Sequence, residues 1–173
     1  MRSLSRSYLL GLVALMVAVA TTGYFLAGRT LAPSAPSQPT LPRSTVTLSN
    51  PAGEYEVPVY KVNNPQQFFL ANQRTLRENE GILYLFTQIR DDSWSGQGFK
   101  QSVSVAFFSG RRDQARILRI MDIEPCGTPP PGKTCPSYEP SVAYRMALEM
   151  PKGWFAENRI AVGDQMRVNE ARN

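Results

Sequence analysis

The feature that most constrains this chain is a run of apolar side chains at every second position in its C-terminal part. The run comprises Val142, Tyr144, Met146, Leu148 and Met150, with Ala143, Arg145, Ala147 and Glu149 between them. Because successive side chains of a β-strand point to opposite faces, a two-residue period predicts a strand with one face in the core. We therefore expect a strand over residues 142–150 and a domain built mainly from β-structure.

Similar patterns predict the other strands. An apolar run typical of a fully buried strand covers 82–86, and alternating segments that favour strands cover 55–62, 103–107, 115–123 and 165–168. Pro58 cannot donate a ladder hydrogen bond, so the strand that contains it is expected at a sheet edge. The glycine-containing sequence 110–113 predicts the turn of a hairpin.

One helix and one shorter helical turn complete the expected domain. Asn64 followed by Pro65 is a typical helix start, because the asparagine side chain caps the first turn and proline fits the first helical position. We expect this helix to continue to Arg77 and a short helical turn to cover 153–158. The apolar side chains that the helix offers to the core are Phe68, Phe69 and Leu76.

An uncharged segment at the N-terminus predicts export. Residues 8–27 carry no charge, and about twenty residues at ~1.5 Å each just cross a hydrocarbon core of ~30 Å. Arg2 and Arg6 precede this segment and Arg29 follows it, so the positive-inside bias places the rest of the chain outside the cytoplasm. The alternative is a signal peptide cleaved after Ala20. Both alternatives export the domain, as membrane-anchored or secreted protein.

A proline-rich segment separates this helix from the domain. Prolines recur at every third position, at Pro33, Pro36, Pro39 and Pro42, which matches the period of a polyproline II helix and indicates a semi-rigid spacer. The expected organisation is a signal anchor over 1–29, a linker over 30–44 and an extracytoplasmic β-rich domain over 45–170.

The charge and composition exclude several function classes. The formal charge is +5, but after Arg43 the chain has 15 basic and 14 acidic residues. This near-neutral part lacks the basic excess that binding to phosphate backbones requires, so we expect no nucleic-acid partner. The chain contains no histidine, which excludes Ser-His-Asp and Cys-His catalysis. No cofactor and no metal ion are expected.

The two cysteines predict a disulfide. Cys126 and Cys135 are separated by eight residues, and in an exported domain such a pair most simply closes a small loop, which the chain-entropy model values at roughly 2 to 3 kcal/mol. The alternative is a redox-active or metal-binding dithiol. The spacing is not C-x-x-C, and without histidine only carboxylates could complete a metal site.

Five segments in the same order resemble a known family. They are EGILYLF (80–86), IEPC (123–126), CPSYEP (135–140), ALEMPKGW (147–154) and IAVGDQMRV (160–168), and together they resemble the domain of unknown function 192 family. The resemblance covers roughly residues 55–168. It implies a mainly β fold, a compact β-sandwich or jelly-roll-like barrel with one short α-helix, here preceded by a transmembrane or signal helix. It implies no reaction.

One segment departs from the pattern of that family. Between Trp94 and Ser109, family members carry an Asn-Thr pair followed by Pro-Leu-Asp. Here Gly98 and Phe99 stand in place of Asn-Thr, and 102–104 (SVS) stands in place of Pro-Leu-Asp. This chain therefore lacks the carboxylate of that segment.

Residues in the irregular segments are the candidates for a site. Two loops, 91–98 and 126–140, are rich in glycine, proline and polar residues, where exposed aromatics can stack on sugar or peptide and paired acids can act as acid and base. The alternative roles are turn capping for the acids and core packing for the rings. The candidates are Asp91, Asp92, Trp94, Phe99, Glu124 and Tyr138.

Three functions remain open. The first is a non-enzymatic binding or structural module of the cell envelope, tethered to the membrane by its N-terminal helix, with an envelope glycan or protein as partner. The second is a small carboxylate-dependent hydrolase or glycan-processing enzyme, which requires two titratable acids about 10 Å apart or less in one pocket. The third is an assembly partner of a membrane complex, which requires an exposed apolar patch.

Overall fold

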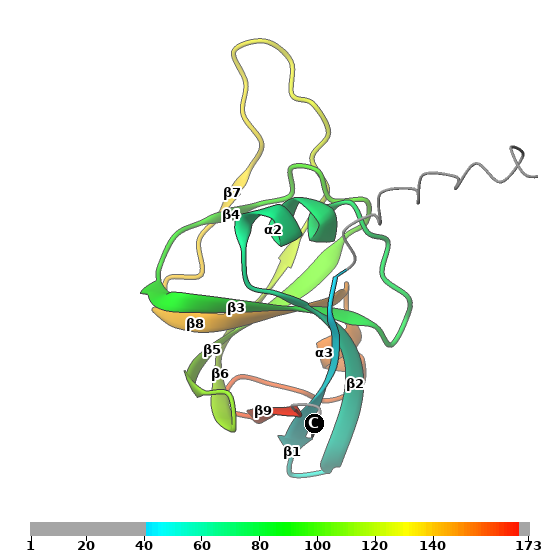
Figure 1. Cartoon of the computed structure of the whole chain (residues 1–173). Helices are drawn as coiled ribbons and strands as arrows, with labels where there is room; N and C mark the ends of the chain where they lie inside the picture. The colour runs from blue at the N-terminus through cyan, green and yellow to red at the C-terminus, as the bar shows by residue number, and fades with distance from the viewer. Residues whose placement is uncertain (1–40, 170–173) are drawn as a thin grey trace, which may run out of the picture. The chain divides into compact units, whose positions relative to one another are not determined.

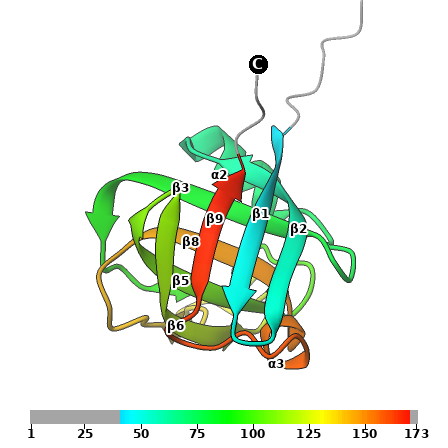
Figure 2. The same ribbon diagram turned by 90° about the horizontal axis from the view of Figure 1, so that it is seen from below.

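The computed structural model describes residues 41–169, and in this part of the chain seven strands form a closed barrel (Figure 1). The order around the barrel is β1, β2, β3, β8, β5, β6 and β9, so that β9 closes the sheet between β6 and β1 (Figure 2). The strands are β1 (Arg43–Asn50), β2 (Gly53–Val62), β3 (Gly81–Arg90), β5 (Val103–Arg111), β6 (Gln114–Ile123), β8 (Tyr144–Pro151) and β9 (Gln165–Asn169). The mainly β fold is confirmed, and the sheet closes into a barrel rather than splitting into a sandwich.

Two short helices and a small second sheet accompany the barrel in the described residues. They are α2 (Pro65–Asn72), β4 (Trp94–Ser95), β7 (Ser137–Tyr138) and α3 (Trp154–Glu157), and β4 pairs with β7. The predicted anchor or signal helix over 8–27 lies outside the described residues, as does the proline-rich segment up to residue 40. Within residues 41–169, the helices are too short or too polar to cross a bilayer.

The helix α2 begins as predicted and ends early. Asn64 caps it by accepting a hydrogen bond from the Gln67 N–H at 3.0 Å, and Pro65 occupies the first turn. The prediction that the helix reaches Arg77 is wrong, because it ends at Asn72. Leu76 still reaches the core, from the irregular segment that follows the helix. The expectation that Phe69 is a core residue is also wrong, since its side chain is 68% exposed.

The connection through α2 joins a parallel pair of strands. β2 and β3 run parallel, which requires a crossover, and α2 lies in that crossover. Their ladder begins only at Val59 paired with Gly81. Within the described sheet, Pro58 therefore has β1 on one side and no strand on the other. This local edge explains how the sheet tolerates a proline.

The barrel interior is filled mainly by aliphatic side chains from alternate positions of its strands. They include Val46, Leu48, Val57, Val59, Leu83, Ile117, Met146 and Leu148, and the aromatic ring of Phe108 packs among them. The short helix α3 lies at one end of the barrel (Figure 2) and adds Trp154 and Phe155 to this cluster. The Trp154 indole N–H donates to the Asn79 Oδ1 at 2.9 Å, so the ring is buried without an unsatisfied polar atom.

The outer face of β3, β8 and β5 is also buried. A second apolar cluster covers it, and its members include Val62, Ala71, Leu76, Tyr84, Phe99, Phe107, Ile123, Tyr144 and Ala147. The one-sided burial expected of the strand over 142–150 is therefore wrong for β8, where Ala147 and Glu149 are buried as well. The reason is that α2 and the segments around β4 and β7 form a second layer over the sheet (Figure 1).

Candidate ligand-binding site

A pocket of about 790 Å³ lies in this second layer, between α2, the end of β3 and the segment 92–99. Its walls are rich in aromatic rings, contributed by Phe68, Phe69, Tyr84, Phe86, Trp94, Phe99 and Tyr144. Pockets of roughly 300 to 1,000 Å³ with mainly apolar walls and a few polar groups are the usual sites for small ligands in proteins. We take this pocket, called the aromatic pocket below, as the candidate site.

Trp94 is held in one orientation in the wall of the aromatic pocket. Its indole N–H donates to the Tyr144 hydroxyl oxygen at 2.9 Å. Its ring meets Tyr84 at 5.1 Å and Phe107 at 5.5 Å between centroids, and both contacts are edge-to-face. Since three partners fix the half-buried ring, a ligand would meet a surface that needs no ordering on binding.

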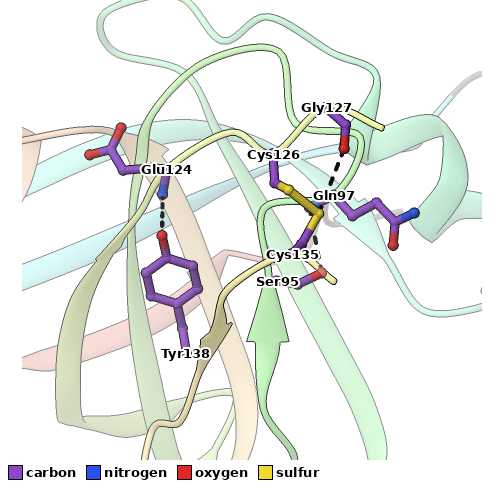
Figure 3. The surroundings of a disulfide bond; sticks show 7 residues. All are labelled: Ser95, Gln97, Glu124, Cys126, Gly127, Cys135 and Tyr138. Carbon is purple, nitrogen blue, oxygen red and sulfur yellow. Dashed lines mark hydrogen bonds between the residues drawn. A yellow bond between two sulfur atoms is a disulfide. The ribbon is translucent and has the colours of Figure 1, made fainter. Parts of the chain in front are cut away.

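The small sheet of β4 and β7 positions Trp94 from the other side. Trp94 pairs with Tyr138 across this sheet. The Tyr138 hydroxyl oxygen accepts a hydrogen bond from the Glu124 N–H at 3.2 Å (Figure 3), which ties β7 to the end of β6. The loop that begins after β6 and contains β7 therefore backs the wall of the pocket.

The cysteine pair lies in the same loop. The sulfur atoms of Cys126 and Cys135 are 2.09 Å apart, at disulfide distance, beside β4 (Figure 3). The Cys126 N–H donates to the Gly96 carbonyl oxygen at 2.8 Å. A Cβ atom at Gly96 would lie 1.8 Å from the Glu124 carbonyl oxygen, so this close approach of the two loops requires a glycine.

The helix α2 supplies the opposite wall through two adjacent phenylalanines. Phe68 is half-buried and packs on Tyr84 and Phe86, with centroid separations of 5.2 and 5.7 Å. Phe69 lines the same pocket but is 68% exposed. A large apolar side chain left in water at the edge of a pocket is the kind of surface that a ligand covers.

The aromatic pocket carries one acid and one base, and they neutralise each other. Arg90 donates through Nε and Nη2 to the two carboxylate oxygens of Asp92, at 2.7 and 2.5 Å. The hydrogen bonds from Arg90 lower the pKa of Asp92, so this carboxylate stays ionised. The Arg90 guanidinium also lies 5.1 Å from the centre of the Phe86 ring. No other charged side chain of the described residues lines the pocket.

A buried acid lies behind the pocket. The Tyr84 hydroxyl donates to Glu149 Oε2 at 2.7 Å, and Glu149 is 3% exposed. Burial raises the pKa of Glu149 to about 7, opposed by the hydrogen bond from Tyr84. Burial and the nearby Glu149 charge both raise the pKa of Tyr84. Tyr84 also lines the aromatic pocket, so Glu149 is in direct contact with a residue of the site without lining the pocket itself.

The structure brings three of the predicted site residues together. Asp92, Trp94 and Phe99 all line the aromatic pocket. Phe99 is 8% exposed, so it packs in the second apolar cluster and also lines the pocket. Asp91 lies outside this pocket, in a groove beside the end of β3. Tyr138 supports the wall from behind without lining it.

Glu124 belongs to a separate surface network. Its carboxylate forms an ion pair with Lys152 at 2.5 Å and accepts a hydrogen bond from the Ser102 hydroxyl. The hydrogen bonds from Lys152 and Ser102 lower the pKa of Glu124. Glu124 does not line the aromatic pocket, whose one carboxylate is that of Asp92, so this pocket does not hold the two acids that a glycosidase would need.

The segment that departs from the family pattern has a different partner. Ser104, at the position of the missing carboxylate, is buried and donates to Asp122 Oδ1 at 2.6 Å from the neighbouring strand. It also accepts a hydrogen bond from the Gly153 N–H at 2.9 Å. A carboxylate is thus present beside position 104, contributed by β6 instead of β5.

Several residues of the site were not among the predicted ones. Phe68, Tyr84, Phe86 and Tyr144 were assigned to the core by their apolar patterns, and Arg90 was not singled out by any pattern. The closeness of Phe68 and Phe69 in sequence could have shown that α2 cannot bury both, because adjacent residues point about 100° apart around a helix.

Solved structures of similar fold do not add an activity. A Sinorhizobium meliloti 1021 protein described as a proposed transcription regulator aligns with 16% identity and a TM-score of 0.62, covering 76% of this chain and 98% of its own. A Novosphingobium aromaticivorans DSM 12444 protein of unknown function aligns with 16% identity and a TM-score of 0.63, covering 82% and 96%. At this identity, the likeness concerns the fold alone.

The sequence itself decides the family. No curated protein matches this chain. The model of the DUF192 family, described as "Uncharacterized ACR", matches residues 45–168, which include all seven barrel strands except the first two residues of β1 and the last residue of β9. The chain therefore belongs to the domain of unknown function 192 family, as its five sequence segments predicted.

Proposed function

We propose that this chain is a membrane-tethered domain outside the cytoplasm that binds a ligand of the cell envelope in the aromatic pocket. The observation that carries this proposal is the pocket itself, where Trp94 and Phe69 present ring surface that is not packed in the core. A rigid aromatic wall and an exposed aromatic edge are the usual anchors of a binding site. The uncharged segment 8–27 supports the tether.

Binding is favoured over chemistry by the state of the acids. The aromatic pocket holds one carboxylate, Asp92, which is fully paired with Arg90. An acid with a lowered pKa and an occupied hydrogen-bonding site is a poor proton donor at neutral pH. The hydrolase alternative therefore has no specific observation in its favour.

The binding test uses the two tryptophans as reporters. Incorporation of 5-fluorotryptophan into the full chain, held in a detergent without a sugar head group, gives one ¹⁹F signal for Trp94 in the pocket and one for Trp154 at the start of α3. We expect benzyl alcohol, an apolar ring with one hydroxyl, to move the Trp94 signal while the Trp154 signal stays in place. Substitution Phe69→Ser should weaken this response. A Trp94 signal that does not move, or two signals that move together, would contradict the proposal.

The location has its own test. Carbonate extraction of membranes should leave the full chain in the pellet, since an integral helix is not released by high pH. Thiol labelling of intact cells should modify Cys126 and Cys135 only after reduction. A chain found in the carbonate supernatant contradicts the tether, and labelling without reductant contradicts an oxidising location.

A further inference from the structure

We propose that the aromatic pocket takes an uncharged saccharide, an inference that rests on the proposed binding function. Three independent features of the pocket support an uncharged saccharide: the charge of the lining, the ring surface that it presents, and the polar groups that are left without partners. Each feature concerns described residues that line the pocket.

The charges of the lining favour a neutral ligand. The only ionic groups among the lining residues are Arg90 and Asp92, and both donor positions of the arginine that face the acid are in use. An anionic ligand beside Arg90 would also meet the carboxylate of Asp92, and a cationic ligand beside Asp92 would also meet the guanidinium of Arg90. The two opposite charges largely cancel, so a ligand without charge is the better match.

The ring surface favours a ligand with a flat apolar face. Trp94 directs its N–H to Tyr144 and therefore offers the pocket only its π surface. Phe69 on α2 adds a second ring that is mostly exposed. The C–H face of a pyranose ring is apolar and of similar width, and it stacks on such rings while its edges stay polar.

The free polar groups favour a ligand with many hydroxyls. The side-chain amides of Asn72, Gln73 and Gln97 line the pocket, and no hydrogen bond inside the described chain engages them. Ser93 and Ser95 add hydroxyl groups. Each amide carries both a donor and an acceptor. Sugar hydroxyls also donate and accept, whereas each proline of a proline-rich peptide offers a carbonyl acceptor and no N–H donor.

The experiment follows the Trp94 and Trp154 ¹⁹F signals of the full chain in a detergent without a sugar head group. The probes are an uncharged tetrasaccharide of N-acetylglucosamine, an anionic tetragalacturonate and an uncharged proline-rich peptide. We expect the neutral tetrasaccharide to move the Trp94 signal in a saturable way and to leave the Trp154 signal unchanged. Its affinity should not change between low and high salt, because no ion pair forms on binding.

Matched substitutions locate the binding. Gln97→Ala should weaken the neutral saccharide about fivefold, the effect of one lost hydrogen bond. Gln114→Ala, at the exposed start of β6, should leave the affinity unchanged. Phe69→Ser should weaken it by a similar factor, and Val162→Ser, which removes a side chain of similar exposure (60%) outside the pocket, should not. None of these side chains is buried, so the variants should fold.

Each outcome separates this inference from the proposed function. A response to benzyl alcohol without a response to the neutral saccharide overturns the inference and leaves the binding function in place. If the tetragalacturonate or the peptide binds more tightly than the neutral tetrasaccharide, the inference is also overturned, and the pocket is assigned to an anionic saccharide or to a peptide. Absence of any response at Trp94 overturns both. Equal losses in the pocket variants and in their controls would show that the saccharide binds elsewhere.

Discussion

Trp154 and Trp94 occupy comparable local environments and lead to different expectations. Each indole N–H donates to a polar side chain at 2.9 Å, and each ring makes an edge-to-face contact with an aromatic neighbour. Trp154 is 4% exposed and belongs to the aliphatic cluster inside the barrel. Trp94 is half-buried in the wall of a pocket. A completely buried ring such as Trp154 stabilises the fold, whereas a ring that is held rigidly but left partly open, such as Trp94, is available for binding.

The largest effect is expected from removing the structural ring. Trp154→Ala should lower the free energy of unfolding by about 3 to 5 kcal/mol, because it leaves a cavity in the barrel and an unpaired Asn79. Trp94→Ala should lower the free energy of unfolding by only roughly 1 to 2 kcal/mol, since water can enter the space left by the indole ring. Denaturant titration of both variants measures the difference. Equal losses would remove the distinction between the two rings.

The next effect concerns the buried acid in the second layer. The folded-state pKa of Glu149 is raised to about 7 from an ordinary value of 4.5. The folded protein thus holds this proton more tightly than the unfolded chain, so the stabilisation is complete below about pH 4.5 and is lost as the pH rises through 7. The loss should approach roughly 3 kcal/mol.

The measurement is the difference between two variants in their dependence on pH. Glu149→Gln keeps an acceptor for Tyr84 and removes the titration, so its unfolding free energy should vary less between about pH 5 and pH 8 than that of the natural chain. Glu157→Gln, at an exposed site on α3, should leave the dependence as it is. A natural chain whose stability rises over this range relative to Glu149→Gln would show that Glu149 is ionised when folded.

Loss of the disulfide should lower the local stability of β4 and β7 more than that of the barrel strands. Paired substitution of Cys126 and Cys135 by serine should lower the unfolding free energy by roughly 2 to 3 kcal/mol in the chain-entropy model for a loop of this length. Hydrogen exchange should then increase in β4 and β7 before it increases in the barrel strands, because the loop leads directly into β7 and its Cys126 N–H is hydrogen-bonded to Gly96, just after β4. Uniform loosening of β1 and β9 would contradict this local role.

The smallest effect on stability is expected at the pocket edge. Phe69→Ser should change the unfolding free energy by less than about 0.5 kcal/mol, since the side chain is mostly in water. The same substitution should reduce the response of Trp94 to ligands. A large loss of stability would mean that Phe69 packs in the fold and does not serve binding.

Sequence patterns predicted the barrel better than the site. The two-residue periods located β2, β6, β8 and β9, because each of these strands sends alternate side chains into one continuous core. The same patterns failed at Glu149, since its burial depends on a layer built from α2 and distant loops. No strand was expected at 43–50, although β1 is there, because its alternation is short and follows a proline-rich stretch.

The pocket could be predicted only in part for the same reason. Asp92, Trp94 and Phe99 come from one irregular segment, and their proximity to each other follows from sequence. Their meeting with Phe69 and Tyr144 depends on the crossover of α2 and on the pairing of β4 with β7, two arrangements that a local pattern does not contain. The apolar patterns also assigned Phe69 to the core, whereas the structure leaves its side chain 68% exposed at the pocket.

The proposed function depends most on ligand binding in the aromatic pocket. The most direct measurement is the pair of ¹⁹F signals from the 5-fluorotryptophan chain during titration with the uncharged N-acetylglucosamine tetrasaccharide and with benzyl alcohol. We expect the Trp94 signal to move to saturation and the Trp154 signal to keep its chemical shift. A Trp94 signal that ignores both compounds, while the chain stays folded, would contradict the proposed function.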